Sequence, residues 1–269
     1  EDKALSTFSK TESVIELGVG KNMVLSIRYW LLAFGLIDDK GELTKEARLL
    51  VEQDDNNPID PSLENKDSLW LLHTSLVNNQ FATLYSFFFC DFFKRKASRT
   101  FTEREVINGI QSWLKNFDLK PPSERSLKND FKVLVDNYCP KLNSKDSEES
   151  MMNLMVDLNL IQKTNYKSDG ESVYELNKIA SDSISNNLFA TLLIKHFKNK
   201  SESLDNLYDR IGYPLILDRE QFINRIENVC FEYPEYFVYK EDAGLKELQL
   251  NKEQHYLDFL TNTQLDKAC

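Results

Sequence analysis

The chain has 269 residues, of which 41% are hydrophobic and 28% charged, and its formal net charge is -10. This is ordinary globular composition, and the length suits two or three small domains better than one. The longest apolar run, residues 81–93, is too short to cross a bilayer and no signal peptide precedes it, so we expect a cytoplasmic protein without a membrane partner.

The first predicted element is a pair of helices joined by a glycine turn. Residues 13–17 form a short apolar-faced helix, Gly18-Val19-Gly20 breaks it, and a second helix covers residues 23–36. This is the build of a helix-turn-helix, whose second helix commonly enters the DNA major groove. DNA contacts are predicted at the start and on the polar side of the second helix: Lys21, Asn22, Ser26 and Arg28.

A helical wheel leaves the role of this second helix open. One stripe is expected to face the core: Met23, Ile27, Trp30, Leu31 and Phe34. The outward positions are predicted to be Asn22, Ser26, Arg28, Tyr29 and Ala33, together with Leu25 and Leu32. Because two exposed leucines suit a protein contact better than DNA, contact with DNA and internal packing remain equal alternatives.

Three further helices are predicted before residue 94. They cover residues 44–51, 67–77 and 81–93. Aromatic residues in the third of these cover more than one face, which is typical of a fully buried central helix rather than of a base-stacking platform.

The charge is distributed unevenly along the chain. Residues 38–67 carry an excess of about six negative charges, whereas residues 92–141 carry an excess of about five positive ones. This asymmetry favours one DNA face on an otherwise acidic molecule, although an ordinary mosaic of surface charge remains an alternative.

The basic stretch contains two helices with clear start signals. Thr102 and Glu105 form a capping box for a helix to Leu114, and Ser123 caps a helix over residues 124–138. The apolar residues of the latter form a single core-facing stripe. DNA contacts are predicted on its opposite face and in the preceding basic segment: Lys94, Arg95, Arg99, Arg125, Lys128, Asn129 and Lys132.

The remaining elements repeat a pattern of helices followed by a hairpin. The helices cover residues 149–158, 187–198, 203–211 and 219–231, the last capped by Asp218. Hairpins turn at residues 168–170 and 242–244. The predicted fold is mainly α, with tandem winged-helix or helix-turn-helix units and short β-hairpin wings around a buried helical core. Its predicted domains are residues 1–66, 67–200 and 201–269.

No catalytic or metal-binding group is assigned from the sequence. The three histidines and four cysteines are scattered without ligand spacing. Asp60, Glu64 and Lys66 superficially resemble the acidic-acidic-lysine pattern of metal-dependent nucleases, but their tight spacing and flanking prolines favour a loop. If the chain cuts DNA, Mg²⁺ held by carboxylates is the cofactor we expect.

Three sequence blocks resemble a bacterial family of unknown function that includes SspB-type proteins and is encoded beside PAPS-reductase-like genes in DNA phosphorothioation operons. The blocks are residues 14–31 (Val-Ile-Glu-Leu-Gly-Val-Gly-Lys-Asn-Met-Val through Ser-Ile-Arg-Tyr-Trp-Leu), residues 60–73 (Asp-Pro, Leu-Glu and Leu-Trp-Leu-Leu-His) and residues 126–130 (Ser-Leu-Lys-Asn-Asp). Members of that family carry a further N-terminal segment with a Gly-His-Glu-Thr-Phe-like motif. Since the chain begins at Glu1 rather than Met, we expect residues to precede it.

The resemblance implies a component of a phosphorothioate modification and restriction system for phage defence, which replaces a non-bridging phosphate oxygen with sulfur. It implies double-stranded DNA, a cysteine desulfurase, a PAPS-reductase-like sulfurtransferase and an ATPase as partners. SspB-type proteins are associated with nicking DNA, so one hypothesis is a metal-dependent DNA-nicking endonuclease. The alternative is a non-catalytic DNA-binding adaptor or a transcription regulator.

Overall fold

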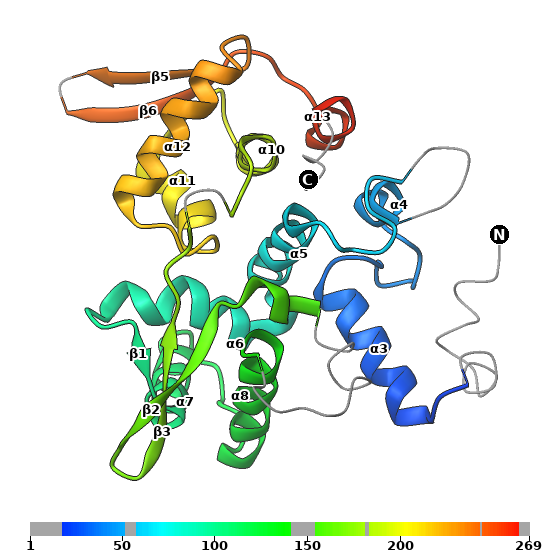
Figure 1. Cartoon of the computed structure of the whole chain (residues 1–269), viewed down its shortest axis with the longest axis vertical. Helices are drawn as coiled ribbons and strands as arrows, with labels where there is room; N and C mark the ends of the chain where they lie inside the picture. The colour runs from blue at the N-terminus through cyan, green and yellow to red at the C-terminus, as the bar shows by residue number, and fades with distance from the viewer. Residues whose placement is uncertain (1–17, 52–57, 141–153, 181–182, 243, 264–269) are drawn as a thin grey trace.

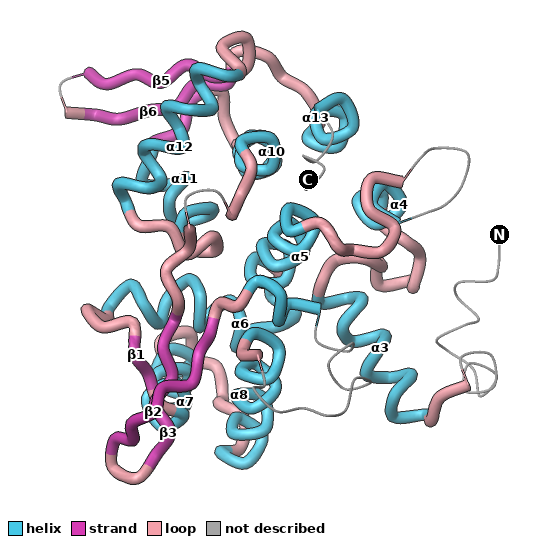
Figure 2. Tube along the Cα trace, in the orientation of Figure 1, coloured by secondary structure: helices cyan, strands magenta, loops and turns pink. Residues whose placement is uncertain are grey.

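The computed structural model describes residues 18–51, 58–140, 154–180, 183–242 and 244–263. It is mainly helical, with two small antiparallel three-stranded sheets at opposite ends of the long axis (Figures 1 and 2). Within the described ranges, no helix is both long enough and apolar enough to cross a membrane. The helix predicted over residues 13–17 lies outside the described residues, as does the start of the one predicted over 149–158.

The N-terminal helices are α3 (Lys21–Ala33), α4 (Lys45–Val51) and α5 (Lys66–Asn78). All three were predicted, but the predicted orientation of α3 is partly wrong. Met23 is 36% exposed and Ala33 is fully buried. The reason is that the last turn of α3 packs on the segment after α5: the Asn79 side-chain amide donates to the carbonyl oxygens of Leu32 (2.9 Å) and Ala33 (3.2 Å).

The aromatic segment after α5 is not the single helix predicted for residues 81–93. It runs as η1 (Gln80–Ala82, 3-10), α6 (Thr83–Ser86), η2 (Phe87–Phe92, π) and η3 (Phe93–Arg95, 3-10). Phe87, Phe88 and Phe89 are all buried, whereas Phe81 is 48% exposed. Burial of three consecutive phenylalanines requires protein on nearly every side, which a regular amphipathic helix does not have. The expectation of full burial therefore holds for Phe87, Phe88 and Phe89, whereas Phe92 and Phe93 are half-buried and Phe81 is exposed.

Two parts of the chain share one topology: a short strand, helices, and then a hairpin whose second strand lies in the middle of the sheet. The first part comprises β1 (Thr100–Phe101), α7 (Glu103–Lys115), α8 (Glu124–Tyr138), η4 (Leu154–Leu158), β2 (Ile161–Ser168) and β3 (Glu171–Leu176), with sheet order β1-β3-β2. The second comprises β4 (Ser201–Ser203), α11 (Leu204–Leu207), η5 (Tyr208–Gly212), α12 (Arg219–Glu232), β5 (Phe237–Asp242) and β6 (Leu245–Leu250), with order β4-β6-β5.

Local start and turn signals in these parts act as predicted. The Thr102–Glu105 capping box begins α7, and the Ser123 hydroxyl accepts a hydrogen bond from the Ser126 backbone N–H at the start of α8. Asp218 caps α12. Asp169 (φ 48°) and Gly170 (φ 82°) make the two-residue β2–β3 turn, whose positive φ angles match the twist of the hairpin.

The elements share one continuous hydrophobic core that extends from Ala33 to Leu260. Two helices join the N-terminal and C-terminal parts: α10 (Asn186–His196), which was predicted, and α13 (Tyr256–Thr263), which was not. Glu46 on α4 accepts hydrogen bonds from the Lys195 ammonium (2.6 Å), the Tyr256 hydroxyl (2.9 Å) and the Ser75 hydroxyl (3.1 Å). The three predicted domains therefore meet at one buried carboxylate.

Candidate nucleic-acid interface

Helix α8 presents a basic and amide-bearing face to solvent. Its apolar stripe, Leu127, Phe131, Leu134, Val135 and Tyr138, is buried as predicted. The predicted DNA-contact residues on the other side are all exposed: Arg125, Lys128, Asn129 and Lys132. Burial of one stripe fixes the rotation of the helix, so these four side chains project together.

One of these cations is already paired on the helix surface. The Lys128 ammonium lies 2.8 Å from the Glu124 carboxylate one turn earlier. Their hydrogen bond and opposite charges raise the pKa of Lys128 and lower the pKa of Glu124. Exposed pairs of this kind contribute little to stability, so a phosphate group can replace Glu124 at low cost.

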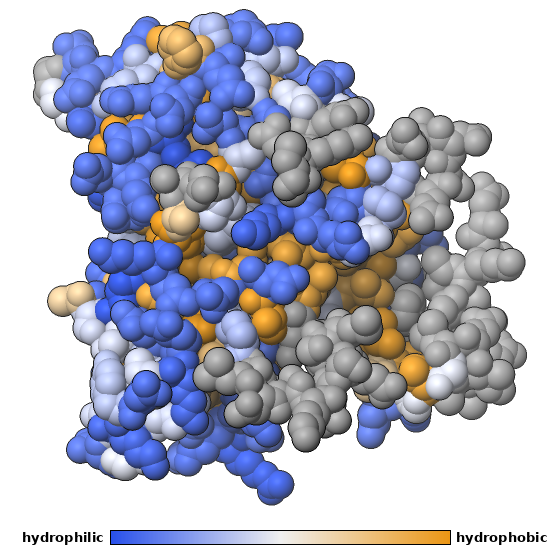
Figure 3. Space-filling view, viewed as in Figure 1, coloured by the Kyte–Doolittle hydropathy of each residue, from blue (hydrophilic) through white to orange (hydrophobic). Residues whose placement is uncertain are grey.

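The β2–β3 hairpin adds basic and aromatic side chains that sequence reasoning did not assign to the site. Lys163, Tyr166 and Lys167 on β2 are exposed, Tyr166 by 56%. Strand β2 packs on α8, and the hairpin lies at the same end of the molecule as α8 (Figure 1). Hydrophilic side chains cover this end (Figure 3). The mixture of lysines and tyrosine along β2 was a usable signal in the predicted hairpin.

Helix α12 holds the same place in the second part and carries the opposite charge. Its exposed residues include Glu220, Glu227 and Glu232, and Arg219 pairs with Asp205 at 2.5 Å. Of these two equivalent helices, α8 exposes three cations (Arg125, Lys128 and Lys132) against the carboxylates of Glu124 and Asp130, whereas α12 exposes one cation against three glutamates. Because duplex DNA is a dense line of negative charge, α8 is the better of the two interfaces.

The predicted contacts before α7 have different surroundings. The Arg99 guanidinium is half-buried and donates to the backbone carbonyls of Leu176 (2.8 Å) and Asn177, and burial lowers its pKa. Lys94 lies 3.3 Å from Asp209 and over the Tyr213 ring at 4.7 Å. Arg95 is exposed. Arg99 and Lys94 therefore hold parts of the protein together, whereas Arg95 is available to a ligand.

The predicted contacts on α3 form a separate set. Lys21, Asn22 and Ser26 are exposed, and Gly20 begins the helix without a side-chain cap. The Arg28 guanidinium donates to the Asp39 carbonyl at 3.4 Å. Leu25 is 54% exposed beside them. An uncapped helix start favours an anion, but the exposed leucine still favours a protein contact.

The residues considered for metal-dependent catalysis have structural roles or stand apart. Asp60 is buried, and its carboxylate accepts hydrogen bonds from the backbone N–H groups of Glu64 (3.1 Å) and Asn65 (2.9 Å). Lys66 and Glu64 are exposed. In the part of the chain that the structure describes, no three His, Cys, Asp or Glu residues are grouped as metal ligands.

His73 is a buried structural residue. Its Nε2 lies 2.8 Å from the Pro214 carbonyl and its Nδ1 2.8 Å from the Tyr138 hydroxyl. A carbonyl only accepts, so Nε2 carries the proton and Nδ1 accepts from Tyr138. Burial lowers the pKa of His73 to about 4, so the imidazole is neutral at pH 7.

Comparisons with known proteins identify both a family and a fold. A family model described as "Protein of unknown function (DUF4007)" matches residues 1–264. An SspB crystal structure has a similar fold, with a TM-score of 0.80 and 23% identity over 98% of this chain and 81% of that one. A magnesium ion-bound SspB crystal structure gives a TM-score of 0.78 and 22% identity over the same shares. No curated protein matches the chain.

Proposed function

The chain belongs to the DUF4007 family, and from this premise we propose that it is the DNA-binding component of a bacterial DNA phosphorothioate modification and restriction system. The family membership agrees with the resemblance found in residues 14–31. The protein partners that we propose for this chain are the cysteine desulfurase, the PAPS-reductase-like sulfurtransferase and the ATPase of such a system.

We interpret the two repeated parts as winged-helix units. The strand order β1-β3-β2, with α7 and α8 between β1 and β2, is the arrangement in which a helix and a flanking hairpin contact the duplex together. In this proposal α8 enters a groove, and the lysines of β2 contact phosphates beside it. Phosphate contacts set position and affinity, and Asn129 is suited to reading a base edge.

The observation that carries this proposal is the difference between α8 and α12. Both helices occupy the same position in the same topology, yet α8 exposes Arg125 and Lys132 where α12 exposes glutamates. General surface charge would not single out one of the two. The acidic α12 unit is then free to face solvent or protein partners.

The DNA proposal is tested by reversing charge on α8. The double substitution Arg125→Glu and Lys132→Glu should weaken binding to a short duplex about tenfold or more. It should also reduce the slope of log affinity against log salt by about 0.9 for each phosphate that the variant no longer neutralises. Fluorescence anisotropy at several NaCl concentrations measures both quantities.

A matched control carries the same charge change elsewhere. Lys40→Glu with Lys240→Glu alters two exposed lysines on other elements and should leave affinity within about twofold. A second variant, Lys163→Glu with Lys167→Glu, should weaken binding as the α8 variant does if β2 is part of the interface. Equal binding by the α8 variant and the control would exclude α8 as the DNA face.

Metal-dependent nicking is a second candidate function. It is supported by the magnesium ion in one SspB structure of similar fold. The resemblance to SspB-type proteins implies the association with nicking. We expect the chain to convert supercoiled plasmid to open circles with Mg²⁺ and not with EDTA. Arg125→Glu with Lys132→Glu should slow this conversion. Plasmid that stays supercoiled at every Mg²⁺ concentration, despite measured DNA binding, would favour the non-catalytic adaptor.

A further inference from the structure

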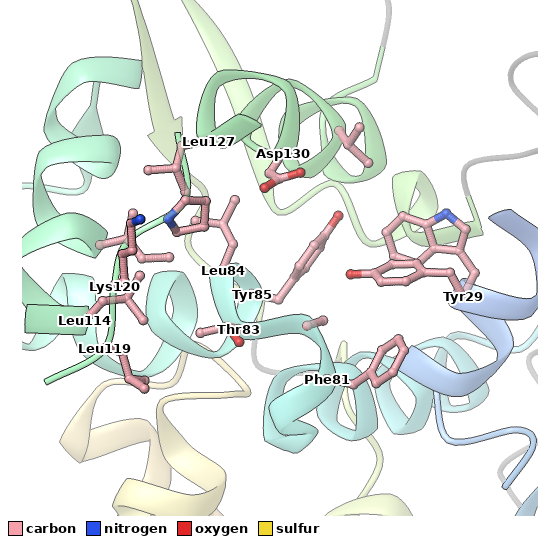
Figure 4. Close-up of a pocket in the computed structure, with 15 residues that line it drawn as sticks. Tyr29, Phe81, Thr83, Leu84, Tyr85, Leu114, Leu119, Lys120, Leu127 and Asp130 are labelled. Atoms are coloured by element: carbon pink, nitrogen blue, oxygen red, sulfur yellow. The ribbon is translucent and has the colours of Figure 1, made fainter. Parts of the chain in front are cut away.

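A cavity of about 560 Å³ lies between α3, α6, α7 and α8. This volume is within the range of sites that enclose small organic molecules. Figure 4 shows that the cavity has two different ends. Leu114, Leu119 and Leu127 line an aliphatic end, and Tyr29, Phe81 and Tyr85 line an aromatic end.

The aromatic rings form a corner rather than a stack. The Tyr29 centroid lies 5.2 Å from that of Phe81, with the ring planes 44° apart. Trp30 is nearly perpendicular to both Tyr29 (85°, 5.3 Å) and Tyr85 (87°, 5.9 Å). Rings at such angles direct several π faces and edges into one space. A cation held against these faces is attracted by their quadrupoles.

Asp130 supplies the charged group of the aromatic end. Its side chain points into the cavity toward the hydroxyl groups of Tyr85 and Tyr29 (Figure 4). Among the described residues it has no hydrogen-bond or ion-pair partner, although it remains accessible to solvent. Burial raises the pKa of Asp130; burial and the nearby Asp130 charge raise the pKa of Tyr29.

The other polar groups of the cavity do not neutralise Asp130. The Tyr85 hydroxyl accepts a hydrogen bond from the Asn137 amide at 2.7 Å, so Tyr85 is held in place from the core side. Lys120 lies at the aliphatic end, apart from Asp130 (Figure 4). The aromatic end therefore combines a negative charge with aromatic walls and an exposed Phe81.

We propose that this cavity binds a small organic cation, an alkylated ammonium head on a hydrocarbon body. The head would lie among Tyr29, Trp30 and Phe81 beside the Asp130 carboxylate, and the body would reach the leucines of the aliphatic end. An alkylated ammonium suits the aromatic end because its methyl groups can pack against the ring faces while its positive charge lies beside Asp130. The proposal is independent of DNA binding.

Two pairs of ligands separate charge from shape. Choline and 3,3-dimethylbutan-1-ol have the same shape and differ in the positive charge. Hexyltrimethylammonium and tetramethylammonium share the head and differ in the hydrocarbon body. With the full chain in titration calorimetry or ligand-observed NMR, we expect choline to bind about fivefold or more tightly than the alcohol. Hexyltrimethylammonium should bind about tenfold or more tightly than tetramethylammonium.

An isosteric variant and a truncation assign the binding to this cavity. Asp130→Asn should weaken choline binding about fivefold or more and leave the alcohol unchanged, and Tyr29→Ala should weaken the binding of choline and hexyltrimethylammonium alike. Glu227→Gln, an exposed carboxylate on α12, should change nothing. Thermal unfolding of each variant shows that it is folded. Equal binding of the isosteric pair, unchanged choline binding in Asp130→Asn, or no binding of any probe would overturn the proposal.

Discussion

At the scale of single residues, His73 shows how burial determines chemistry. A histidine with two hydrogen-bond partners and an aromatic setting could be read as catalytic, yet both of its ring nitrogens are used inside the core. Tyr138 and the Pro214 carbonyl fix its tautomer. His73 therefore connects α5, α8 and the segment before α12.

This arrangement predicts a dependence of stability on pH. Burial lowers the pKa of His73, and also that of His196, to about 4, whereas the pKa of an unfolded histidine is about 6.5. Between these values the unfolded state binds more protons, so the free energy of unfolding rises with pH and falls on acidification. Urea unfolding of the parent chain between pH 6.5 and 5 should show this decrease.

Replacing His73 isolates its share of that slope. His73→Phe should be less stable at pH 7 because Tyr138 and Pro214 lose their partner, but its slope should be smaller by about 1 kcal/mol per pH unit. His255→Asn removes an exposed imidazole and serves as the matched control. A slope unchanged by His73→Phe would contradict a neutral, buried His73.

At the scale of elements, the sequence predicts a helix or strand correctly where its local signals are strong and misses it where they are weak. Helix α8 was predicted with its observed bounds because Ser123 caps it and its apolar residues repeat at helical spacing. Strand β1 has two residues and pairs with β3, more than 70 positions away, so no local pattern could reveal it. The π-helical turn and α13 were likewise missed, since both depend on what surrounds them.

The candidate site was predictable to the same degree. Capping and periodicity placed Arg125 and Lys132 on an exposed face, as the structure has them. Arg99 was indistinguishable in sequence from an exposed arginine because its acceptors, the carbonyls of Leu176 and Asn177, lie on β3 and just beyond it. Charge counts along a chain cannot separate cations that bind ligands from cations that hold the fold.

Gly109 offers a test of how two elements approach. It lies in the interior of α7, where glycine is unfavourable, but a Cβ there would lie 2.9 Å from the Phe87 ring of η2. Gly109→Ala should therefore destabilise the protein by about 1–3 kcal/mol in urea unfolding, despite a gain in helix propensity of about 1 kcal/mol. Asn108→Ala, at the exposed neighbouring position, should be neutral or slightly stabilising. Stabilisation by Gly109→Ala would show that the ring yields.

At the scale of the whole molecule, one continuous hydrophobic core runs through the predicted domains, and polar contacts link them. The division into residues 1–66, 67–200 and 201–269 remains a prediction. Glu46 lies in the first of these, and it accepts hydrogen bonds from Lys195 in the second and from Tyr256 in the third. Lys94 and Asp209, an exposed pair at 3.3 Å, link the second and third of these as well but contribute little to stability. We therefore expect unfolding in a single transition.

Two measurements test this picture: the stability lost when the Glu46 cluster is weakened, and the number of unfolding transitions in the parent chain. Glu46→Gln removes the charge that pairs with Lys195 and should lower the free energy of unfolding by about 1–3 kcal/mol. Glu253→Gln disrupts an exposed pair with Lys200 and should change it by less than about 0.5 kcal/mol. Circular dichroism and tryptophan fluorescence should report the same midpoint. Two separate midpoints in the parent chain would show that the parts unfold independently.

The Glu46 carboxylate also constrains how sequences of this fold can diverge. Its partners Lys195 and Tyr256 lie 149 and 210 positions further along the chain, so the contacts of Glu46 depend on distant parts of the sequence. An apolar residue at position 46 would leave the Lys195 ammonium and the Tyr256 hydroxyl without this acceptor. Substitutions at Glu46, Lys195 and Tyr256 should therefore occur together among relatives. An alignment in which these three positions covary would show that α4, α10 and α13 evolve together.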